Sequence, residues 1–134
     1  LALREQIALK LGRCYGCRVD PEAEVTVVPG ATEAIFCAIM ATVRAGDEVI
    51  LFDPSYDSYE PSVRLAGGRA VRIPLLPPAF AIDWQRVDEA LTPRTRMIVI
   101  NSPHNPTGSV LGAADLERAY ASLSASYGRE ASHA

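Results

Sequence analysis

The sequence has 134 residues, of which 49% are hydrophobic and 22% are charged, and its formal net charge is -3. This profile indicates one soluble globular unit that is long enough to bury a core. The mild acidity argues against the basic face that nucleic-acid binding requires, and no uncharged apolar run approaches the length of a membrane span.

We therefore predict a cytoplasmic protein without nucleic-acid or membrane partners. No basic start followed by an apolar stretch and a cleavage site supports secretion. Since the sequence starts with Leu1 rather than methionine, we expect that upstream residues are missing.

The first half of the chain alternates predicted helices with short apolar strands. Leu3, Ile7 and Leu11 recur every four residues, which is helical spacing, and Gly12 and Gly16 end this helix. The predicted elements are a helix over residues 1–13, a strand over 25–28, a helix over 31–44 and a strand over 48–52.

The alternation continues in the second half. Asp83 fits the N-cap of a helix, because its carboxylate can accept the free amide hydrogens of the first turn. The pair Pro77-Pro78 indicates a linker. The predicted elements are a helix over residues 57–66, a strand over 69–74, a helix over 83–91, a strand over 96–100 and a helix over 112–120.

Strands that are apolar throughout, alternating with helices, indicate a sheet that is buried on both faces. We therefore predict an α/β fold with a mostly parallel sheet and flanking helices over residues 1–120. Residues 121–134 are small and polar where this rhythm predicts another strand. We interpret them as a divergent polar tail, which a frameshift or a truncation near Tyr120 would explain.

The cysteines offer one motif, the C-x-x-C pair of Cys14 and Cys17, which has the spacing of redox and zinc sites. No second ligand pair accompanies it, so we interpret the pair as incidental. Cys37 lies in an apolar helical pattern, where a small buried thiol is ordinary.

Three loops carry polar or aromatic residues where ligands bind in open α/β sheets, beyond the carboxyl ends of strands. In the first, residues 29–33 (PGATE), the helix start presents free amide hydrogens that suit a phosphate. Thr32 could add a hydroxyl, and a simple capped helix start is the alternative. The loop lacks the G-x-G-x-x-G and G-K-[ST] fingerprints, which disfavours dinucleotide and P-loop binding.

The second loop, residues 53–56, places Tyr56 where its ring could stack on a planar ligand or pack under its own helix. The third, residues 101–108 (NSPHNPTG), holds Asn101 and Asn105, whose amides both donate and accept hydrogen bonds. They could stabilise a phenolate-like oxygen on a conjugated ring, or satisfy the backbone of the turn. We expect His104 to belong to the loop, because no catalytic partner for it is identifiable.

Taken together, three segments resemble the large domain of pyridoxal-phosphate (PLP) aminotransferases of class I/II. They are residues 25–36 (VTVVPGATEAIF), 45–61 (AGDEVILFDPSYDSYEP) and 101–108. The resemblance is greatest to the methionine and kynurenine aminotransferase branch, and it covers residues 1–120 as a partial PLP-binding large domain. It implies a homodimeric enzyme that uses PLP to transfer an amino group between an amino acid and a 2-oxo acid.

The resemblance also assigns roles to individual residues. Ala31 and Thr32 match the helix start that binds the PLP phosphate, and Tyr56 matches the aromatic ring that stacks on the pyridine. Asn105 matches the asparagine bonded to the phenolic oxygen, and Asn101 matches one near the substrate carboxylate. In the family the peptide bond after Asn105 is cis.

Two residues that PLP chemistry needs are not found at the matching positions. Lys10 is the only lysine and precedes the phosphate loop, whereas the Schiff-base lysine of the family follows N-P-T-G. The aspartate that pairs with the pyridine nitrogen should fall near His133, where no D-E-x-Y pattern occurs. Without these groups there is no covalent anchor and the electron sink is weak, so we predict that the chain is inactive alone.

The leading hypothesis is therefore a fragment of a PLP-dependent aminotransferase. The alternative is a non-catalytic remnant or a weak PLP- or phosphate-binding module. Nucleotide binding by the α/β sheet is a third hypothesis, which the missing glycine fingerprint disfavours. Because a sheet cut midway has an unpaired apolar edge, we also expect the isolated chain to be marginally folded or self-associating.

Overall fold

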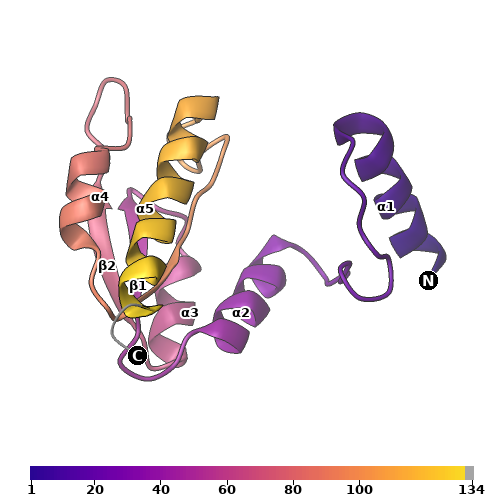
Figure 1. Ribbon diagram of the computed structural model, residues 1–134, viewed down its shortest axis with the longest axis horizontal. Helices are drawn as coiled ribbons and strands as arrows, with labels where there is room; N and C mark the ends of the chain where they lie inside the picture. The colour runs from indigo at the N-terminus through magenta and orange to yellow at the C-terminus, as the bar shows by residue number, and fades with distance from the viewer. Residues whose placement is uncertain (132–134) are drawn as a thin grey trace. The chain divides into compact units, whose positions relative to one another are not determined.

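The computed structural model describes residues 1–131, and it describes side chains for residues 1–124. The chain divides into two compact units, one of residues Leu1–Ala34 and one that begins at Ile35. Helix α2 (Ala31–Thr42) begins in the first unit and continues in the second. Figure 1 traces the elements in chain order.

The first unit consists of helix α1 (Ala2–Tyr15), a turn and the start of α2. Helix α1 ends at Gly16, whose φ of 66° lies in the left-handed region that favours glycine. The Gly16 amide donates to the carbonyl of Gly12 at 3.1 Å and closes the last turn. None of the residues of α1 is buried.

The strand predicted over residues 25–28 is wrong. This segment pairs with no strand in the part of the chain that the structure describes. Its β-branched residues favour extended backbone, but a strand forms only where a neighbouring strand supplies hydrogen-bond partners.

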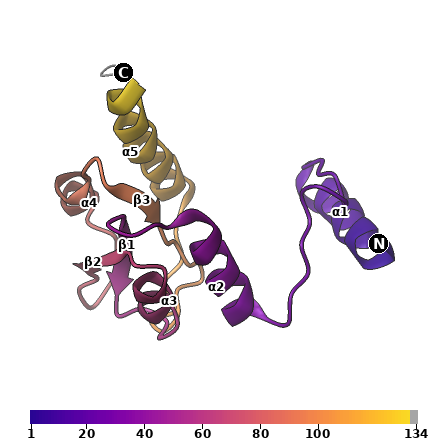
Figure 2. The ribbon, with the colours of Figure 1, turned by 90° about the horizontal axis from the view of Figure 1, so that it is seen from below.

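The second unit is built on a parallel sheet, which in the described residues has the strand order β2-β1-β3. The strands are β1 (Glu48–Asp53), β2 (Arg69–Pro74) and β3 (Thr95–Ile98). Helix α3 (Tyr59–Leu65) connects β1 to β2, and helix α4 (Trp84–Ala90) connects β2 to β3 (Figure 2). The predicted α/β fold with a parallel sheet is confirmed, and the carboxyl ends of its strands share one edge of the sheet.

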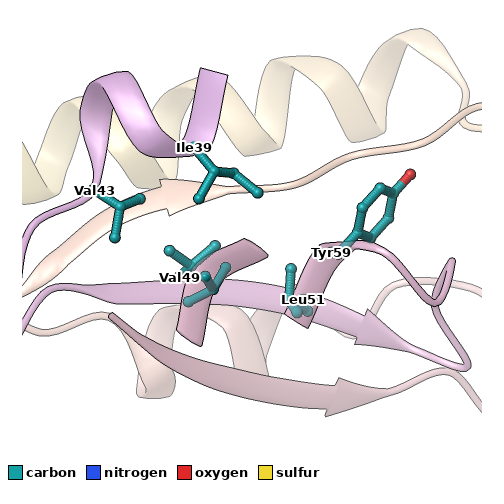
Figure 3. Packing of buried hydrophobic residues seen from close by; sticks show 6 residues of the cluster. Ile39, Val43, Val49, Leu51 and Tyr59 are labelled. Atoms are coloured by element: carbon teal, nitrogen blue, oxygen red, sulfur yellow. The ribbon is translucent and has the colours of Figure 1, made fainter. Parts of the chain in front are cut away.

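Alternate residues of β1 supply two cores, one on each face of the sheet, as the period of two in a strand requires. Val49 and Leu51 pack against α2 and α3 (Figure 3), whereas Ile50 and Phe52 pack on the side of α4. The first core is completed by Ile39, Val43, Tyr59 and Val63, and the second by Ile73, Leu75 and Val87.

Helix α2 contributes Ile35 and Ile39 to the first core, which are spaced four apart and share one face. Val43, directly after the helix, adds to the same core, and its amide donates to the Ile39 carbonyl at 2.8 Å. Cys37 lies two residues from Ile35 and from Ile39, on another face of the helix, and is exposed. The prediction of a buried thiol at Cys37 is therefore wrong, because an apolar run does not by itself show which side of a helix is covered.

Asp83 caps α4 as predicted. Its carboxylate accepts hydrogen bonds from the amides of Gln85 at 3.1 Å and Arg86 at 3.3 Å. A carboxylate at this position typically stabilises a helix by about 1 kcal/mol.

Helix α5 (Ala113–Ala131) runs beyond the predicted end at Tyr120. Its first turns contact α4, where the indole nitrogen of Trp84 donates to Asp115 at 2.9 Å and Asp88 pairs with Arg118. Since extending a helix costs little once it is nucleated, the small polar residues after Tyr120 continue it. Residues 132–134, which include His133, lie outside the described residues.

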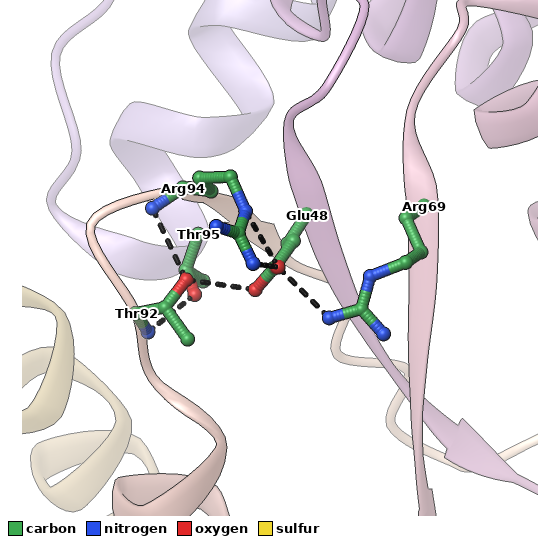
Figure 4. Close-up of polar contacts among 5 residues, drawn as sticks. All are labelled: Glu48, Arg69, Thr92, Arg94 and Thr95. Carbon is green, nitrogen blue, oxygen red and sulfur yellow. Dashed lines mark hydrogen bonds and ion pairs between the residues drawn. The ribbon is translucent and has the colours of Figure 1, made fainter.

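A buried carboxylate organises the amino end of the sheet. Glu48, the first residue of β1, has a side chain that is only 1% exposed and pairs with Arg69 of β2 at 2.8 Å and with Arg94 at 2.6 Å (Figure 4). The hydroxyl of Thr92 donates to its second oxygen at 2.8 Å. Burial alone would raise the pKa of Glu48, but hydrogen bonds from Arg69, Thr92 and Arg94 outweigh it and lower the pKa to about 2.

Candidate functional site

The loop that follows β1 carries Tyr56 to the carboxyl edge of the sheet. Tyr56 lies against the edge of the Tyr59 ring, with centroids 5.6 Å apart and planes at 74°. It also packs partly on the first core and lines an open groove of about 820 Å³. Both roles considered for this ring are therefore compatible, because it packs under its own helix and still borders open space.

The groove is formed by residues 53–57 of the loop, by one side of α3 and by Arg72 of β2. Arg72 donates to Asp53 at 3.0 Å and also pairs with Glu60. A volume of this size is within the range of about 300–1,000 Å³ that small-molecule and cofactor sites occupy.

The loop NSPHNPTG follows β3 and is held together by its own residues. The amide of His104 donates to the Ser109 carbonyl at 2.8 Å, and the amide of Gly108 donates to the His104 carbonyl at 2.7 Å. Gly108 has a φ of 75°, a conformation that favours glycine. The peptide bond between Asn105 and Pro106 is cis, as the resemblance implied.

His104 is the centre of this loop. Its side chain is buried, and Nδ1 lies 2.8 Å from the hydroxyl of Thr107, which lies 2.9 Å from the hydroxyl of Ser109. Burial lowers the pKa of His104, so the neutral imidazole is favoured. These contacts support the interpretation of His104 as a residue of the loop.

The two asparagines of the loop differ in exposure. Asn105 is exposed, whereas Asn101 is half-buried and lines a small cavity together with Phe52 and His104. Among the described residues, neither amide side chain has a hydrogen-bond partner. The alternative role of satisfying the turn backbone is therefore not observed for either side chain, and both amides remain available to a ligand.

Ala31 and Thr32 are the first residues of α2 and are exposed. The preceding Gly30 has a φ of 93°, and a side chain there would meet no atom within 4 Å. The helix start is thus open to solvent, and its first amide groups have the polarity that suits an anion. These two residues belong to the first unit, whereas Tyr56, Asn101 and Asn105 belong to the second.

Within the second unit, the strand order brings two of the predicted loops to one edge of the sheet. Because β1 and β3 are parallel neighbours, the loop with Tyr56 and the loop with Asn101 both leave from their carboxyl ends. Sequence reasoning missed the ion pairs that Arg72 makes in the groove. A charged residue near the end of a predicted strand is the signal that could have pointed to it.

Other kinds of site find no support among the described residues. No group of three or more His, Cys, Asp or Glu side chains there could hold a metal ion. In the same part of the chain, no helix has the length and apolar character needed to cross a membrane.

Residues 1–126 match the family of class I and II aminotransferases. The chain is 53% identical over 114 residues to a methionine aminotransferase of Escherichia coli, an alignment that covers 85% of this chain and 30% of that protein. The chain belongs to the class I and II aminotransferase family.

Solved structures agree with this relationship. A methionine aminotransferase from Escherichia coli superposes with a TM-score of 0.90 and 49% identity, over 92% of this chain and 32% of that one. The N-succinyldiaminopimelate aminotransferase from Mycobacterium tuberculosis gives a TM-score of 0.89 and 47% identity, over 93% of this chain and 33% of that one. The predicted family and fold are thus confirmed.

The chain spans about 30% of the length of the curated relatives that it matches. PLP is the general cofactor of this family, and its members exchange amino groups between amino acids and 2-oxo acids. The only lysine, Lys10, lies in α1, before the start of α2 that contains Thr32. The catalytic residues of the family are therefore not found within this part of its sequence.

Proposed function

We propose that this chain supplies the PLP-contacting loops of an aminotransferase and, taken by itself, binds PLP without catalysing transamination. Tyr56 would stack on the pyridine ring, and Asn105 would donate a hydrogen bond to the phenolic oxygen. The helix start at Ala31 and Thr32 would bind the phosphate, and Asn101 would contact the substrate carboxylate.

The observation that carries this proposal is the pair of unpartnered amides on Asn101 and Asn105. These two side chains make no hydrogen bond with the described residues, whereas His104, Thr107 and Ser109 of the same loop are joined to one another. Their availability, together with the groove lined by Tyr56, fits a planar ligand with acceptor oxygens.

When bound, PLP supplies the electron sink that stabilises a carbanion at the substrate carbon. The chain's own residues would bind and orient it. The neutral amide of Asn105 would stabilise an anionic phenolic oxygen without delivering a proton. The ring of Tyr56 would cover one face of the pyridine and exclude water from it.

The proposed lack of turnover follows from Lys10. A Schiff-base lysine must reach the cofactor aldehyde with a neutral amine, and Lys10 lies in α1, which contains no buried residue.

The active form in the family would also be a homodimer. The exposed side chains of Phe36 and Met40 on α2 support a contact between copies.

The test is a titration of the chain with PLP, followed by absorbance, with Asn105→Ala and Tyr56→Ala as site variants. Loss of one hydrogen bond to an anionic oxygen should weaken binding about tenfold. Arg86→Met serves as a control, because Arg86 pairs with Asp83 on α4 and does not line the groove. Equal PLP affinity in all variants would refute the assigned contacts.

Catalysis is tested separately with PLP, an amino acid and a 2-oxo acid. We expect no turnover and no borohydride-fixed adduct at Lys10. Turnover by the purified chain would refute the second part of the proposal. A specific adduct at Lys10 would instead indicate a different covalent site.

A further inference from the structure

The segment between β1 and α3 carries Tyr56, whose ring packs on the first core and beside the Tyr59 ring. The amide of Tyr59 donates to the carbonyl of Tyr56 at 3.2 Å, and the hydroxyl of Ser58 is buried without a partner among the described residues. The ring of Tyr56 is nevertheless placed at the border of the groove. A contact that reaches both ends of the segment would add to its order and to that of the ring.

Arg72 provides that contact from the neighbouring strand. It lies on β2 opposite Leu51 of β1, and one of its amino groups donates to Asp53 at 3.0 Å. Its other amino group pairs with Glu60 in the first turn of α3. Asp53 and Glu60 stand at the two ends of the segment, so a single guanidinium bridges both of them.

We propose that Arg72 is the positioning residue for Tyr56. By holding Asp53 and Glu60 together, Arg72 fixes both ends of the segment and thereby the ring that lines the groove. The planar fork of a guanidinium can serve two carboxylates at once, which a lysine ammonium does less well. The role of the ring toward PLP rests on the proposed function, whereas the positioning of the segment does not.

Charge alone does not account for Arg72. An arginine on an edge strand can simply keep the edge from pairing with another chain, whereas Arg72 forms ion pairs with two carboxylates at once. Arg72 is 51% exposed, and its partners Asp53 and Glu60 are 30% and 28% exposed. The two carboxylates are thus more enclosed than the guanidinium that joins them.

The experiment uses the full 134-residue chain and five variants: Arg72→Met, Arg72→Lys, Glu60→Gln, the combination of Arg72→Met with Glu60→Gln, and Arg86→Met. Arg86 is the matched control, because it is 50% exposed and pairs with Asp83 away from the segment. Amide hydrogen exchange of residues 53–60 measures the order of the segment. The nuclear Overhauser effect between the rings of Tyr56 and Tyr59 measures the position of the ring.

Arg72→Met should speed exchange in residues 53–60 about fivefold, the factor that two half-exposed ion pairs can supply, and weaken the ring–ring signal. Glu60→Gln should produce about half of the change in the free energy of local opening that Arg72→Met produces. Adding Glu60→Gln to Arg72→Met should not speed the exchange further, because the same ion pair is already lost. Arg72→Lys should fall between the wild type and Arg72→Met. Arg86→Met should behave as the wild type does in these residues.

The proposal would be overturned if Arg72→Met exchanged its amides at the wild-type rate and kept the ring–ring signal. It would also be overturned if Arg72→Lys matched the wild type in both readouts, because that would indicate a role for charge alone. Neither readout requires PLP, so the two proposals fail separately. If the wild type binds no PLP while Arg72→Met loosens the segment, the proposed function fails and the positioning role stands. If PLP binds and Arg72→Met changes neither exchange nor ring contact, only the positioning role fails.

Discussion

Glu48 and Arg94 are joined by two hydrogen bonds, from Nε at 2.9 Å and from Nη2 at 2.6 Å, both to the same carboxylate oxygen. Glu48 begins the central strand, while Arg94 immediately precedes β3. The pair thus fixes where β3 starts relative to β1. Arg69 of β2 contacts the same oxygen, so one carboxylate joins three strands at their amino ends.

We expect Glu48→Gln to lower the free energy of unfolding by about 2–3 kcal/mol. The amide would keep some hydrogen bonds but would lose the attraction of two arginines to a buried charge. Denaturant unfolding at neutral pH measures the change. Glu89→Gln is the matched control, since Glu89 is exposed and accepts a hydrogen bond from Gln85 within α4; it should shift stability by less than about 0.5 kcal/mol.

Acid should destabilise the wild type through the same carboxylate. The folded state lowers the pKa of Glu48 from 4.5 to about 2, so the unfolded state binds the proton more readily over this range. The contribution of Glu48 is complete above pH 4.5 and is lost as the pH falls toward 2. Glu48→Gln should therefore show a flatter stability curve in this range; curves that run parallel for both proteins would contradict this assignment.

His104 should affect stability at higher pH. Its lowered pKa means that the unfolded state binds more protons below the ordinary value for histidine, so stability should rise with pH up to about 6.5. We expect His104→Asn to remove this rise, because asparagine keeps a polar group near Thr107 but does not titrate.

His104→Ala should lower the free energy of unfolding by about 2 kcal/mol, since the hydroxyl of Thr107 loses a buried partner. If His104→Ala unfolds at the denaturant concentration of the wild type, the side chain does not hold the loop.

Ser58→Ala should leave stability unchanged or raise it by up to about 1 kcal/mol. The Ser58 hydroxyl is buried and has no hydrogen-bond partner among the described residues, so its removal gives up no bond and ends an uncompensated desolvation. Ser62→Ala is the contrasting variant, because the Ser62 hydroxyl donates to the Ser58 carbonyl at 2.7 Å. A loss at Ser58 equal to that at Ser62 would mean that the Ser58 hydroxyl is satisfied in solution.

Asn101→Ala and Asn105→Ala should leave the thermal midpoint within about 1–2 °C of the wild type, because neither amide side chain bonds to the described residues, so no hydrogen bond is lost. Differential scanning calorimetry without ligand tests this. A large loss of stability would show that these side chains serve the loop rather than a ligand.

Periodicity predicted the strands of the sheet because each is a short apolar run between turn residues. Residues 69–74 were predicted and observed with the same bounds, and Asp83 was recognised as a cap from chemistry that is local to the helix. Segment 25–28 is also rich in β-branched residues, but it has no partner strand among the described residues. Strand pairing depends on the tertiary structure, so the local sequence could not reveal this difference. The end of α5 was missed for the converse reason, because a helix can continue through polar residues with only one side covered.

The candidate site was predictable only in part. The resemblance identified Tyr56, Asn101 and Asn105, but the sequence could not show that the two amides are unpartnered. Nor could it show that Arg72 reaches both Asp53 and Glu60, because these residues are distant in the chain and meet only through the register of β1 and β2. Contacts of this kind depend on tertiary structure, and composition does not reveal them.

The contact between Trp84 and Asp115 makes the intrinsic fluorescence of the chain a probe of its structure. The sequence contains one tryptophan, so excitation at a wavelength where tyrosine does not absorb isolates the emission of a single indole. That indole donates to Asp115 at the start of α5 and packs on the core beneath α4. Its emission wavelength therefore records the docking of α5 on the side of the sheet opposite Tyr56, and loosening of either neighbour should shift it to the red as water reaches the ring.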